Sequence, residues 1–286
     1  MIRAFRMPWF ALLALTGLLL AGAGPAWAAS PLRIGLTPNF LNERHALIAD
    51  WRAYLEDKLG RPVTFILKDS YQETMELLHQ QQIQVAWLCD CPLVTQNPEF
   101  RLLATPLFQG RPYYRSYLVV PDADASTHGL IDLKNKVFAY SDPYSNVGYL
   151  SPRYELKKQG LDPDHFFRRT FFTRSHRKAI EAVAVGVADA ASVNSYIWET
   201  LNRQSPALTG HTRVAARSVE YGFPPFVAYH TLPVEDFHAL RRALLAMAGD
   251  PRGQAVLKNL NLDGFVTPHP EIYLPVREMI RFMEQR

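Results

Sequence analysis

LRIGL at residues 32–36, VTFIL at residues 63–67 and IQVAWL at residues 83–88 are the apolar runs that decide the fold of this chain. Each run is short and has the composition of a β-strand. The segments between them, residues 42–59 and the stretch after Ser70, carry apolar residues at helical spacing instead. Strands that are apolar on both faces and alternate with helices are typical of a parallel sheet covered by helices.

The same alternation of strands and helices restarts after Pro121, in the middle of the chain. From Phe226 onward the sequence predicts one more strand and then mostly helix, including residues 237–247 and 274–283. This restart indicates a second lobe. The predicted strands of the second series are residues 137–140, 168–173 and 190–193, and its predicted helices lie before Lys158 and at residues 175–185 and 197–201.

We therefore predict an α/β protein of two lobes, each with a mixed, mainly parallel sheet, hinged by two crossover segments. Residues 29–118 and 224–286 are predicted to form lobe 1, and residues 119–223 to form lobe 2. The chain is expected to cross near residues 117–120 and to return near residues 219–226, while the last helices complete lobe 1. Because ligands bind beyond the carboxyl ends of strands in open α/β sheets, the two sheet edges should face one cleft.

The N-terminus has the three parts of a secretory signal peptide. Arg3 and Arg6 form the basic part, residues 10–20 the apolar part, and Ala26-Trp27-Ala28 the cleavage site. The apolar run is shorter than the roughly 20 residues that a membrane-spanning helix needs. A lipid anchor is not expected, because there is no cysteine near the cleavage site. We expect residues 1–28 to be removed after Ala28, which places the mature protein in the periplasm.

The composition disfavours several classes of function. Hydrophobic residues make up 48% of the chain and charged residues 20%, which is typical of a globular protein with a sizeable core. The sequence contains no basic run with interleaved aromatic residues, so a nucleic-acid partner is not expected. The motifs of serine hydrolases, zinc proteases, P-loop proteins and dinucleotide-binding proteins are absent. We therefore expect a binding protein that has no catalytic activity and needs no cofactor.

Residues 141–152, SDPYSNVGYLSP, are the most informative stretch for function. They follow a predicted strand and precede a predicted helix, where free backbone N–H groups and the helix dipole favour an anion. The side chains of Ser145 and Asn146 would add donors to such an oxyanion site. Alternatively, Asp142 or Ser145 only caps the helix, because such residues are favoured at helix N-caps. Spacing alone favours this simpler alternative.

The same residues resemble the Asp-Pro-x-Ser-x-Ser-Gly-(x)3-Pro signature of the phosphate, phosphite and phosphonate ABC-transporter binding proteins. The similarity extends over nearly the whole chain after the signal peptide. It implies a type II periplasmic-binding-protein fold with a hinged cleft, a small anionic ligand, and an ABC permease at the inner membrane as partner. The other matching stretches are Asp69-Ser-Tyr71, Gln84-Val-Ala-Trp-Leu88, Arg174-Ser-His176, Ala188-Asp-Ala-Ala191 and Gly222-Phe-Pro-Pro225.

This resemblance implies roles for individual residues. Tyr71, Ser145 and His176 match residues that donate to phosphonate oxygens in the family. Asn146 stands where a threonine is common and keeps a donor, whereas Val147 replaces a serine and loses one. On sequence alone, His176 could instead be a solvated residue in the first turn of a helix.

Two further positions depart from the pattern of the phosphonate-binding members. The family motif Ala-Trp-Tyr-Gly is Ala86-Trp87-Leu88-Cys89 here, so a phenol donor is lost and a thiol appears. Pro224 stands at a position that is acidic in members that bind an amino-alkyl phosphonate, so the partner for an ammonium group is missing. These changes leave the fold prediction unaffected but disfavour the family's best-known ligand.

Cys89 and Cys91 follow the strand predicted at residues 83–88 and are expected, with Asp90, to face the cleft. A disulfide between them would close a very tight ring with poor geometry. They could be buried packing residues, as free cysteines commonly are. Alternatively, their thiolates could bind a soft metal or a thiophilic metalloid such as arsenite, with His176 as a third ligand. The protein would then resemble a branch of the family that senses arsenite for a two-component system and would dock on a histidine kinase.

Tyr117, at the predicted crossover, and Asn194, after the strand predicted at residues 190–193, complete the candidate contacts. The leading hypothesis is a monomeric periplasmic protein that closes its lobes on a small oxyanion for an ABC transporter. The candidate ligand-binding residues are Tyr71, Cys89, Asp90, Tyr117, Ser145, Asn146, Val147, His176 and Asn194, and the candidate metal ligands are Cys89 and Cys91.

Overall fold

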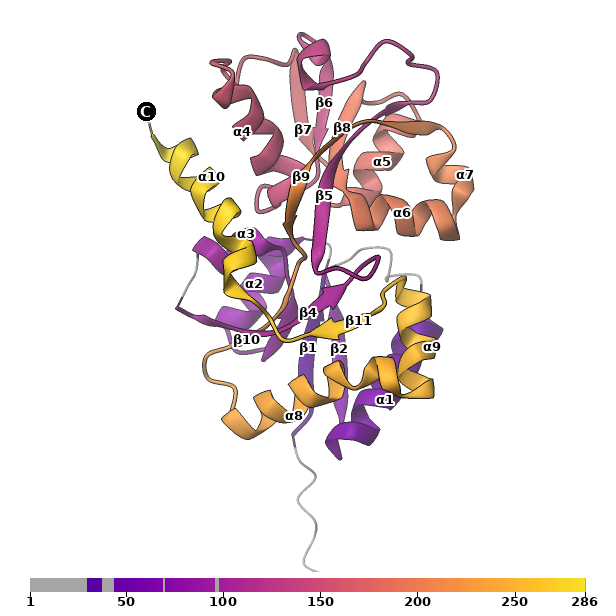
Figure 1. Ribbon diagram of the computed structural model, residues 1–286, viewed down its shortest axis with the longest axis vertical. Helices are drawn as coiled ribbons and strands as arrows, with labels where there is room; N and C mark the ends of the chain where they lie inside the picture. The colour runs from indigo at the N-terminus through magenta and orange to yellow at the C-terminus, as the bar shows by residue number, and fades with distance from the viewer. Residues whose placement is uncertain (1–29, 38–43, 69, 96–97, 286) are drawn as a thin grey trace, which may run out of the picture.

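The computed structural model describes residues 30–37, 44–68, 70–95 and 98–285. Within these residues the strands form two sheets, with the orders β11-β4-β10-β3-β1-β2 and β7-β6-β8-β5-β9. Figure 1 shows one sheet above the other, with helices around each of them. The strands are β1 (Leu32–Leu36), β2 (Val63–Leu67), β3 (Val85–Trp87), β4 (Phe100–Leu107), β5 (Tyr113–Pro121), β6 (Val137–Tyr140), β7 (Arg169–Phe172), β8 (Ala190–Asn194), β9 (Thr212–Gly222), β10 (Phe226–Tyr229) and β11 (Gly264–Val266).

Helices cover both sheets. Helices α1, α8 and α9 pack together beside the six-stranded sheet, whereas α4, α5 and α6 lie around the five-stranded sheet (Figure 1). The helices are α1 (His45–Leu59), α2 (Tyr71–His79), α3 (Asp90–Thr95), α4 (Ser151–Lys158), α5 (His176–Ala184), α6 (Ser195–Gln204), α7 (Pro206–Thr209), α8 (Val234–Leu245), α9 (Pro251–Leu260) and α10 (Leu274–Glu284), with the π-helix η3 (Asn146–Leu150) and the short 3₁₀ helices η2 (Leu130–Leu133), η4 (Met247–Gly249) and η5 (Pro270–Tyr273).

Each sheet combines parallel and antiparallel pairings. β1 lies parallel between β2 and β3, and β6 lies parallel between β7 and β8. β10, β4 and β11 join the first sheet antiparallel, and β5 and β9 join the second in the same way. The predicted two-lobed α/β fold is confirmed. The expected excess of parallel pairings is not found, because segments that return between the sheets add antiparallel strands to each parallel core.

Two segments connect the sheets, and we call the six-stranded sheet with its helices lobe 1 and the five-stranded sheet with its helices lobe 2. The chain leaves lobe 1 through the turn at residues 108–112 and returns at residues 223–225. The first crossover precedes the one expected near residues 117–120, because β5 pairs with β9 from Tyr113 onward. The boundary predicted between residues 118 and 119 therefore moves to before Tyr113.

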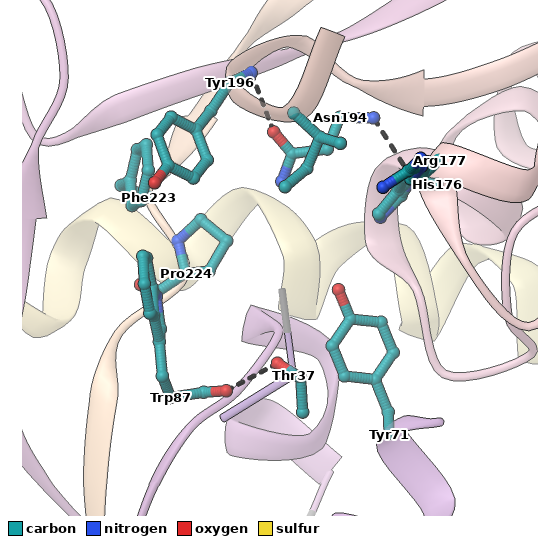
Figure 2. A pocket seen from close by; sticks show the side chains of 10 residues that line it. Thr37, Tyr71, Trp87, His176, Arg177, Asn194, Tyr196, Phe223 and Pro224 are labelled. Atoms are coloured by element: carbon teal, nitrogen blue, oxygen red, sulfur yellow. Dashed lines mark hydrogen bonds between the residues drawn. The ribbon is translucent and has the colours of Figure 1, made fainter. Parts of the chain in front are cut away.

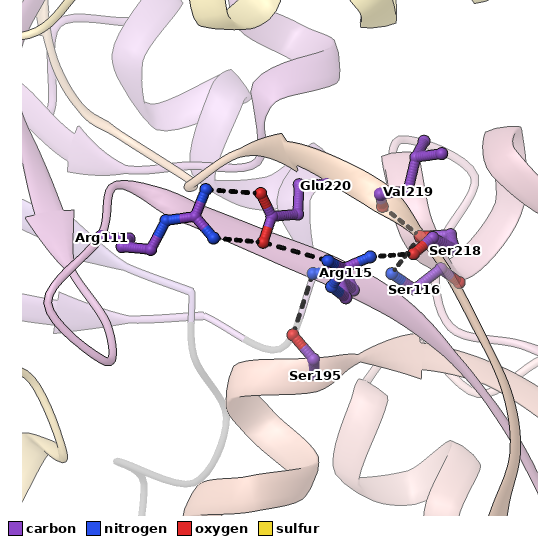
Figure 3. A network of polar contacts seen from close by, with 7 residues as sticks. All are labelled: Arg111, Arg115, Ser116, Ser195, Ser218, Val219 and Glu220. Carbon is purple, nitrogen blue, oxygen red and sulfur yellow. Dashed lines mark hydrogen bonds and ion pairs between the residues drawn. The ribbon is translucent and has the colours of Figure 1, made fainter.

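A network of polar contacts ties β5 to β9 next to the first crossover (Figure 3). Arg111 donates twice to Glu220, at 2.7 and 2.8 Å, and Arg115 Nη2 donates to the same carboxylate at 3.1 Å. Where the pairing of the two strands shifts register, the Ser116 N–H donates to Ser218 Oγ at 2.9 Å. These contacts hold the two strands in one register at the point where the chain passes between the lobes.

The signal peptide predicted at residues 1–28 lies outside the described residues, as does its cleavage after Ala28. β1 begins at Leu32, so the chain enters lobe 1 shortly after the predicted cleavage site. Within the described part of the chain, no helix combines the length and the apolar character needed to cross a bilayer.

Three helices begin at the cleft between the lobes, and each is capped by its own sequence. Ser70, Ser175 and Asn194 precede α2, α5 and α6, and each side chain accepts a hydrogen bond from a backbone N–H of the first turn. Tyr71 and His176 are the first residues of α2 and α5. The caps therefore also fix the positions of two predicted ligand contacts.

The core of lobe 1 fixes the position of Trp87 at the end of β3. Trp51 of α1 packs edge-on against Trp87 and Phe226, with ring centroids 6.4 and 5.9 Å away. Trp87 stacks on Phe226, with centroids 5.3 Å apart and planes inclined by 24°. All three rings are buried. Such aromatic contacts hold the indole in one orientation where β3 meets the cleft.

Helix α10 does not stay within lobe 1 as expected. It leaves lobe 1 beside α3 and runs along α4 of lobe 2 (Figure 1). Lys157 Nζ donates to the carbonyls of Phe282 and Met283 at 3.3 and 3.1 Å, and the Tyr221 hydroxyl donates to Met279 Sδ at 3.6 Å. Of the last helices, α8 and α9 complete lobe 1 as predicted, because they pack on α1. Helix α10 instead packs its apolar face against both lobes.

Candidate functional site

A narrow pocket lies between the two lobes, and the empty space at it, open solvent at its mouth included, is about 400 Å³. Figure 2 shows side chains of both lobes around it. β3 and β8 end at the pocket with Trp87 and Asn194, and Thr37 follows the last residue of β1. The pocket is therefore at the carboxyl ends of parallel strands, where open α/β sheets bind ligands. The lining residues are Thr37, Tyr71, Trp87, His176, Arg177, Asn194, Tyr196, Ile197, Phe223 and Pro224.

His176 supplies an uncharged donor to this pocket. Its Nδ1 accepts a hydrogen bond from the Asn194 N–H at 3.2 Å, so this nitrogen carries the lone pair. Burial lowers the pKa of the ring to about 3, which keeps it neutral near pH 7. The neutral ring therefore carries its proton on Nε2, which lies 3.5 Å from Ser145 Oγ. The alternative of a solvated histidine is wrong, because only 6% of His176 is exposed.

Tyr71 faces His176 from lobe 1. Its hydroxyl points into the pocket (Figure 2). Burial, followed by the nearby Cys89 and Asp142, raises the pKa of the phenol well above its ordinary value, so the hydroxyl keeps its proton. The backbone N–H of Tyr71 donates to Asp142 Oδ2 of lobe 2 at 3.4 Å. Tyr71 and His176 thus line the pocket from opposite lobes, and each carries one polar hydrogen, on the Tyr71 hydroxyl and on His176 Nε2.

A smaller pocket adjoins the first and shares Thr37, Tyr71 and His176 with it; the empty space at it, open solvent included, is about 200 Å³. It lies at the N-terminus of α5, whose first N–H groups have no partner within the helix. Ser141 Oγ is buried at this pocket and has no hydrogen-bond partner among the described residues. These groups are further donors for an anion beside His176. The other lining residues are Asp142, Arg174 and Ser175.

Ser145 caps the N-terminus of the π-helix η3, which precedes α4. Its Oγ accepts a hydrogen bond from the Gly148 N–H at 3.0 Å. The Val147 carbonyl accepts from the hydroxyls of Ser116 and Ser192, both at 2.8 Å, which anchors the turn to β5 and β8. One-turn π-helices of this kind are frequent at functional sites. This one places Ser145 directly behind His176.

Lobe 1 supplies the acceptors for the first turn of η3. Cys89 Sγ accepts from the Asn146 N–H at 3.3 Å, and Asp90 Oδ2 accepts from Asn146 Nδ2 at 2.8 Å. The Tyr114 hydroxyl donates to both carboxylate oxygens of Asp90, at 3.1 and 3.2 Å, and the Cys89 thiol donates to Oδ1 at 3.0 Å. Asp90 is fully buried, and desolvation raises its pKa to about 6. We call Cys89, Asp90, Tyr114 and Asn146 the interlobe cluster.

The interlobe cluster corrects the predicted oxyanion site. Neither Asn146 nor Val147 lines the pockets, because the first bonds to the acceptors of lobe 1 and the second to the sheet. Cys89 and Asp90, which were also predicted as ligand contacts, are those acceptors. A carboxylate and a thiol of the protein itself therefore satisfy the donors that the sequence offers to an external anion.

The two thiols are buried groups with hydrogen bonds. Cys89 and Cys91 are 2% and 7% exposed, and both are free rather than joined in a disulfide. Burial raises the pKa of Cys89, and the hydrogen bond with Cys89 together with burial raises that of Cys91. Among the described residues, no group of three or more His, Cys, Asp or Glu side chains could hold a metal ion. The three-ligand site expected from the two thiols and His176 is therefore not formed, and metalloid sensing is not favoured.

Because both thiols are buried, thiol reagents should modify them slowly. We expect Cys89 and Cys91 to stay unmodified by Ellman's reagent in the folded protein at pH 7.5, because only an accessible thiolate reacts. In urea, two thiols per chain should react at once. Absorbance at 412 nm measures both reactions. Rapid release of thionitrobenzoate by the folded protein would instead reveal an accessible thiolate in the cleft.

Asn194 lies at the pocket as predicted, whereas Tyr117 does not. The Tyr117 hydroxyl donates to Glu199 Oε1 at 3.0 Å, on the side of lobe 2 that α6 covers. Side chains alternate between the two faces of a strand. Tyr114, three residues earlier on β5, therefore points to the opposite face and reaches Asp90. The choice between these two tyrosines depended on the register of β5.

Sequence reasoning placed Pro224 at the ligand but missed the rest of the apolar side of the pocket. Trp87, Tyr196, Phe223 and Pro224 line it together, and we call them the apolar wall. Thr37 was missed as well, although its position directly after a predicted strand was a usable signal. The wall comes from three distant parts of the sequence, and no local pattern connects them.

A comparison with known protein families gives a match over most of the chain. The family described as "ABC transporter, phosphonate, periplasmic substrate-binding protein" matches residues 34–273. The chain belongs to this family. Members of the phosphonate-binding family are periplasmic proteins of transport systems, and the family is defined by substrate binding rather than by catalysis.

One curated protein is similar to part of the chain in sequence. The chain is 32% identical over 103 residues to the probable ABC transporter phosphite binding protein PhnD1 of Prochlorococcus marinus (strain MIT 9301). This match covers 36% of the chain and 33% of PhnD1, so it spans about a third of that relative's length.

Two solved structures share the fold. A binding protein component of an ABC phosphonate transporter from Pseudomonas aeruginosa has a TM-score of 0.80 at 22% identity, over 88% of this chain and 86% of the other. PhnD1 of Prochlorococcus marinus in complex with methylphosphonate has a TM-score of 0.77 at 22% identity, over 90% of this chain and 99% of PhnD1. The expected type II periplasmic-binding-protein fold is confirmed.

Proposed function

We propose that this chain is the substrate-binding component of an ABC transporter for phosphonate, phosphite or a similar small phosphorus oxyanion. The observation that carries this proposal is that Tyr71, which keeps its phenol proton, and the neutral His176 line one pocket between the lobes from opposite sides. Membership of the phosphonate-binding family supports it. So does the shared fold of PhnD1, which was solved with methylphosphonate. A monomer would deliver the captured anion to a permease at the inner membrane.

Neutral donors would hold the oxyanion at this end of the pocket. Tyr71 and His176 would each give one hydrogen bond, and the buried hydroxyl of Ser141 is available beside them. The N-terminus of α5 adds a partial positive charge. Because the pKa of His176 is about 3, its ring stays neutral between pH 5 and pH 8. We therefore expect no loss of affinity from His176 titration over that range.

Contacts from both lobes would couple binding to closure. A ligand that bonds to Tyr71 of lobe 1 and to His176 of lobe 2 makes both contacts only when the lobes are closed. Such a ligand shifts the population towards the closed form. The Tyr71 N–H to Asp142 bond and the interlobe cluster already join the lobes in that form.

Calorimetric titration of the mature protein tests the proposal. The protein is unfolded and refolded to remove bound ligand, and is then titrated with methylphosphonate, phosphite, phosphate and sulfate. We expect at least one phosphorus oxyanion to bind. Replacing His176 by leucine should weaken this binding at least tenfold, because a hydrogen bond to a charged group contributes roughly 1.5–3 kcal/mol.

Two further variants control this experiment. His176→Gln keeps an N–H donor and should lose less affinity than His176→Leu. His165→Leu alters an exposed histidine that pairs with Asp162 and should bind as the parent does. The proposal is overturned if no phosphorus oxyanion binds to the refolded parent, or if a folded His176→Leu variant binds it as tightly.

A further inference from the structure

The pocket has a polar end and an apolar end (Figure 2). Tyr71, His176 and Asn194 lie on one side of it, and the apolar wall lies on the other. The oxygens of a small oxyanion need only the polar end. A phosphonate has three oxygens and one carbon substituent on phosphorus, so its substituent would extend towards the wall.

The apolar wall offers no free polar atom to a ligand. Trp87 Nε1 donates to the Pro224 carbonyl at 2.9 Å. The Tyr196 hydroxyl, in turn, donates to the Leu260 carbonyl at 2.6 Å. The side chains of Phe223 and Pro224 have no hydrogen-bonding group. A ligand would therefore meet only hydrocarbon and ring faces on this side.

The rings of the wall are buried and packed against one another. Tyr196 contacts both other rings, with centroids 6.0 Å from Trp87 and 5.2 Å from Phe223. None of the three rings is more than 1% exposed. Rings that are already fixed lose little conformational entropy when a ligand packs against them. Burial of apolar ligand surface there should therefore contribute to affinity.

The charges around the pocket disfavour an ammonium group at the wall. Arg177 is the only charged side chain that lines the larger pocket within the described residues, because His176 is neutral. The carboxylate of the smaller pocket, Asp142, accepts hydrogen bonds from the N–H groups of Tyr71 and Tyr144. An ammonium group at the wall would lose its hydration without gaining an anionic partner. Contact with the ring faces would return part of this loss. Arg177, whose guanidinium pairs with Glu181 at 2.9 Å, adds no anionic partner.

We propose that the apolar wall binds the uncharged carbon substituent of an alkylphosphonate. The protein would then select short alkylphosphonates over both phosphite, which has no substituent, and aminoalkylphosphonates. This inference rests on the proposed function, because the polar end must hold the phosphonate oxygens.

A ligand series tests the proposal on the parent protein. Calorimetry compares phosphite, methylphosphonate, ethylphosphonate, propylphosphonate and 2-aminoethylphosphonate. We expect affinity to rise about fourfold for each buried carbon until the pocket is full. Propylphosphonate and 2-aminoethylphosphonate have substituents of similar size but different charge. The first should bind at least tenfold more tightly than the second.

A charge placed on the wall provides the matched test. Pro224→Glu would give an ammonium group a partner and should reverse the preference within this pair. Pro224→Ala removes the same ring without adding charge and should keep the preference of the parent. The ligand series on the parent decides the matter if Pro224→Glu does not fold.

The outcomes separate the two proposals. If no phosphorus oxyanion binds, both the proposed function and this inference fail. If phosphite binds as tightly as the alkylphosphonates, only the inference is overturned. The same holds if 2-aminoethylphosphonate equals propylphosphonate on the parent. An increase from phosphite to the alkylphosphonates together with discrimination against the ammonium group supports both.

Discussion

Replacing Asp90 by asparagine is expected to remove about 2.5 kcal/mol of pH dependence from the free energy of unfolding between pH 4 and pH 7. Desolvation raises the pKa of Asp90 from 3.8 to about 6 in the folded protein. An acid with a raised pKa holds its proton more tightly when folded than when unfolded. Its contribution to stability is therefore complete below pH 4 and is lost as the pH rises through 6.

Urea unfolding at pH 4, 5, 6 and 7 measures this effect. The difference between the parent and Asp90→Asn isolates Asp90, because all other titrating groups are common to both proteins. Asp122→Asn alters an exposed carboxylate and should follow the parent curve. Parallel curves for the parent and Asp90→Asn would contradict the prediction and would mean that Asp90 titrates alike in the folded and unfolded chains.

Gly148→Ala is expected to destabilise the protein by about 3 kcal/mol, the upper part of the range for overpacked sites. A Cβ at this position would lie 1.7 Å from Ser141 Oγ, 2.8 Å from Ser141 Cβ and 2.9 Å from Ser145 Oγ. Both serines are buried, so neither can turn away into solvent. The turn would have to shift as a whole, which would also displace Ser145 from His176 and weaken ligand binding.

Two controls make this prediction specific. A Cβ at Gly129 would meet no atom within 4 Å, so Gly129→Ala should change the stability by less than about 0.5 kcal/mol. Ser141→Gly removes the nearest obstructing atoms and should recover part of the loss in the Gly148→Ala background. Additive effects of these two substitutions in urea unfolding would contradict the proposed clash.

Much of the fold follows from local sequence. The runs at residues 32–36, 63–67 and 83–88 coincide with or contain β1, β2 and β3, because a short apolar run between polar helices can be buried only in a covered sheet. The antiparallel strands were harder to place. β5 looks like any other apolar strand, and its pairing partner β9 lies about a hundred residues away along the chain.

The candidate site divides in the same way. Tyr71 and His176 were predicted through the family resemblance, and Asn194 from its place after a predicted strand. Capped helices fix all three positions locally. Asn146 was misassigned because its partner, Asp90, belongs to the other lobe. A helix N-terminus offers the same donors to a ligand and to a carboxylate of the protein, and only the closed tertiary structure decides between them.

Helix α10 gives the lobes a third attachment besides the two crossovers. Two crossovers alone leave the lobes free to rotate about one axis. A helix fixed beside α3 on one lobe and α4 on the other acts as a strut across that rotation. Opening would require this helix to slide or detach, and we expect this to raise the barrier that a departing ligand has to cross. The last helix would then influence how long the ligand stays, although none of its residues lines the pocket.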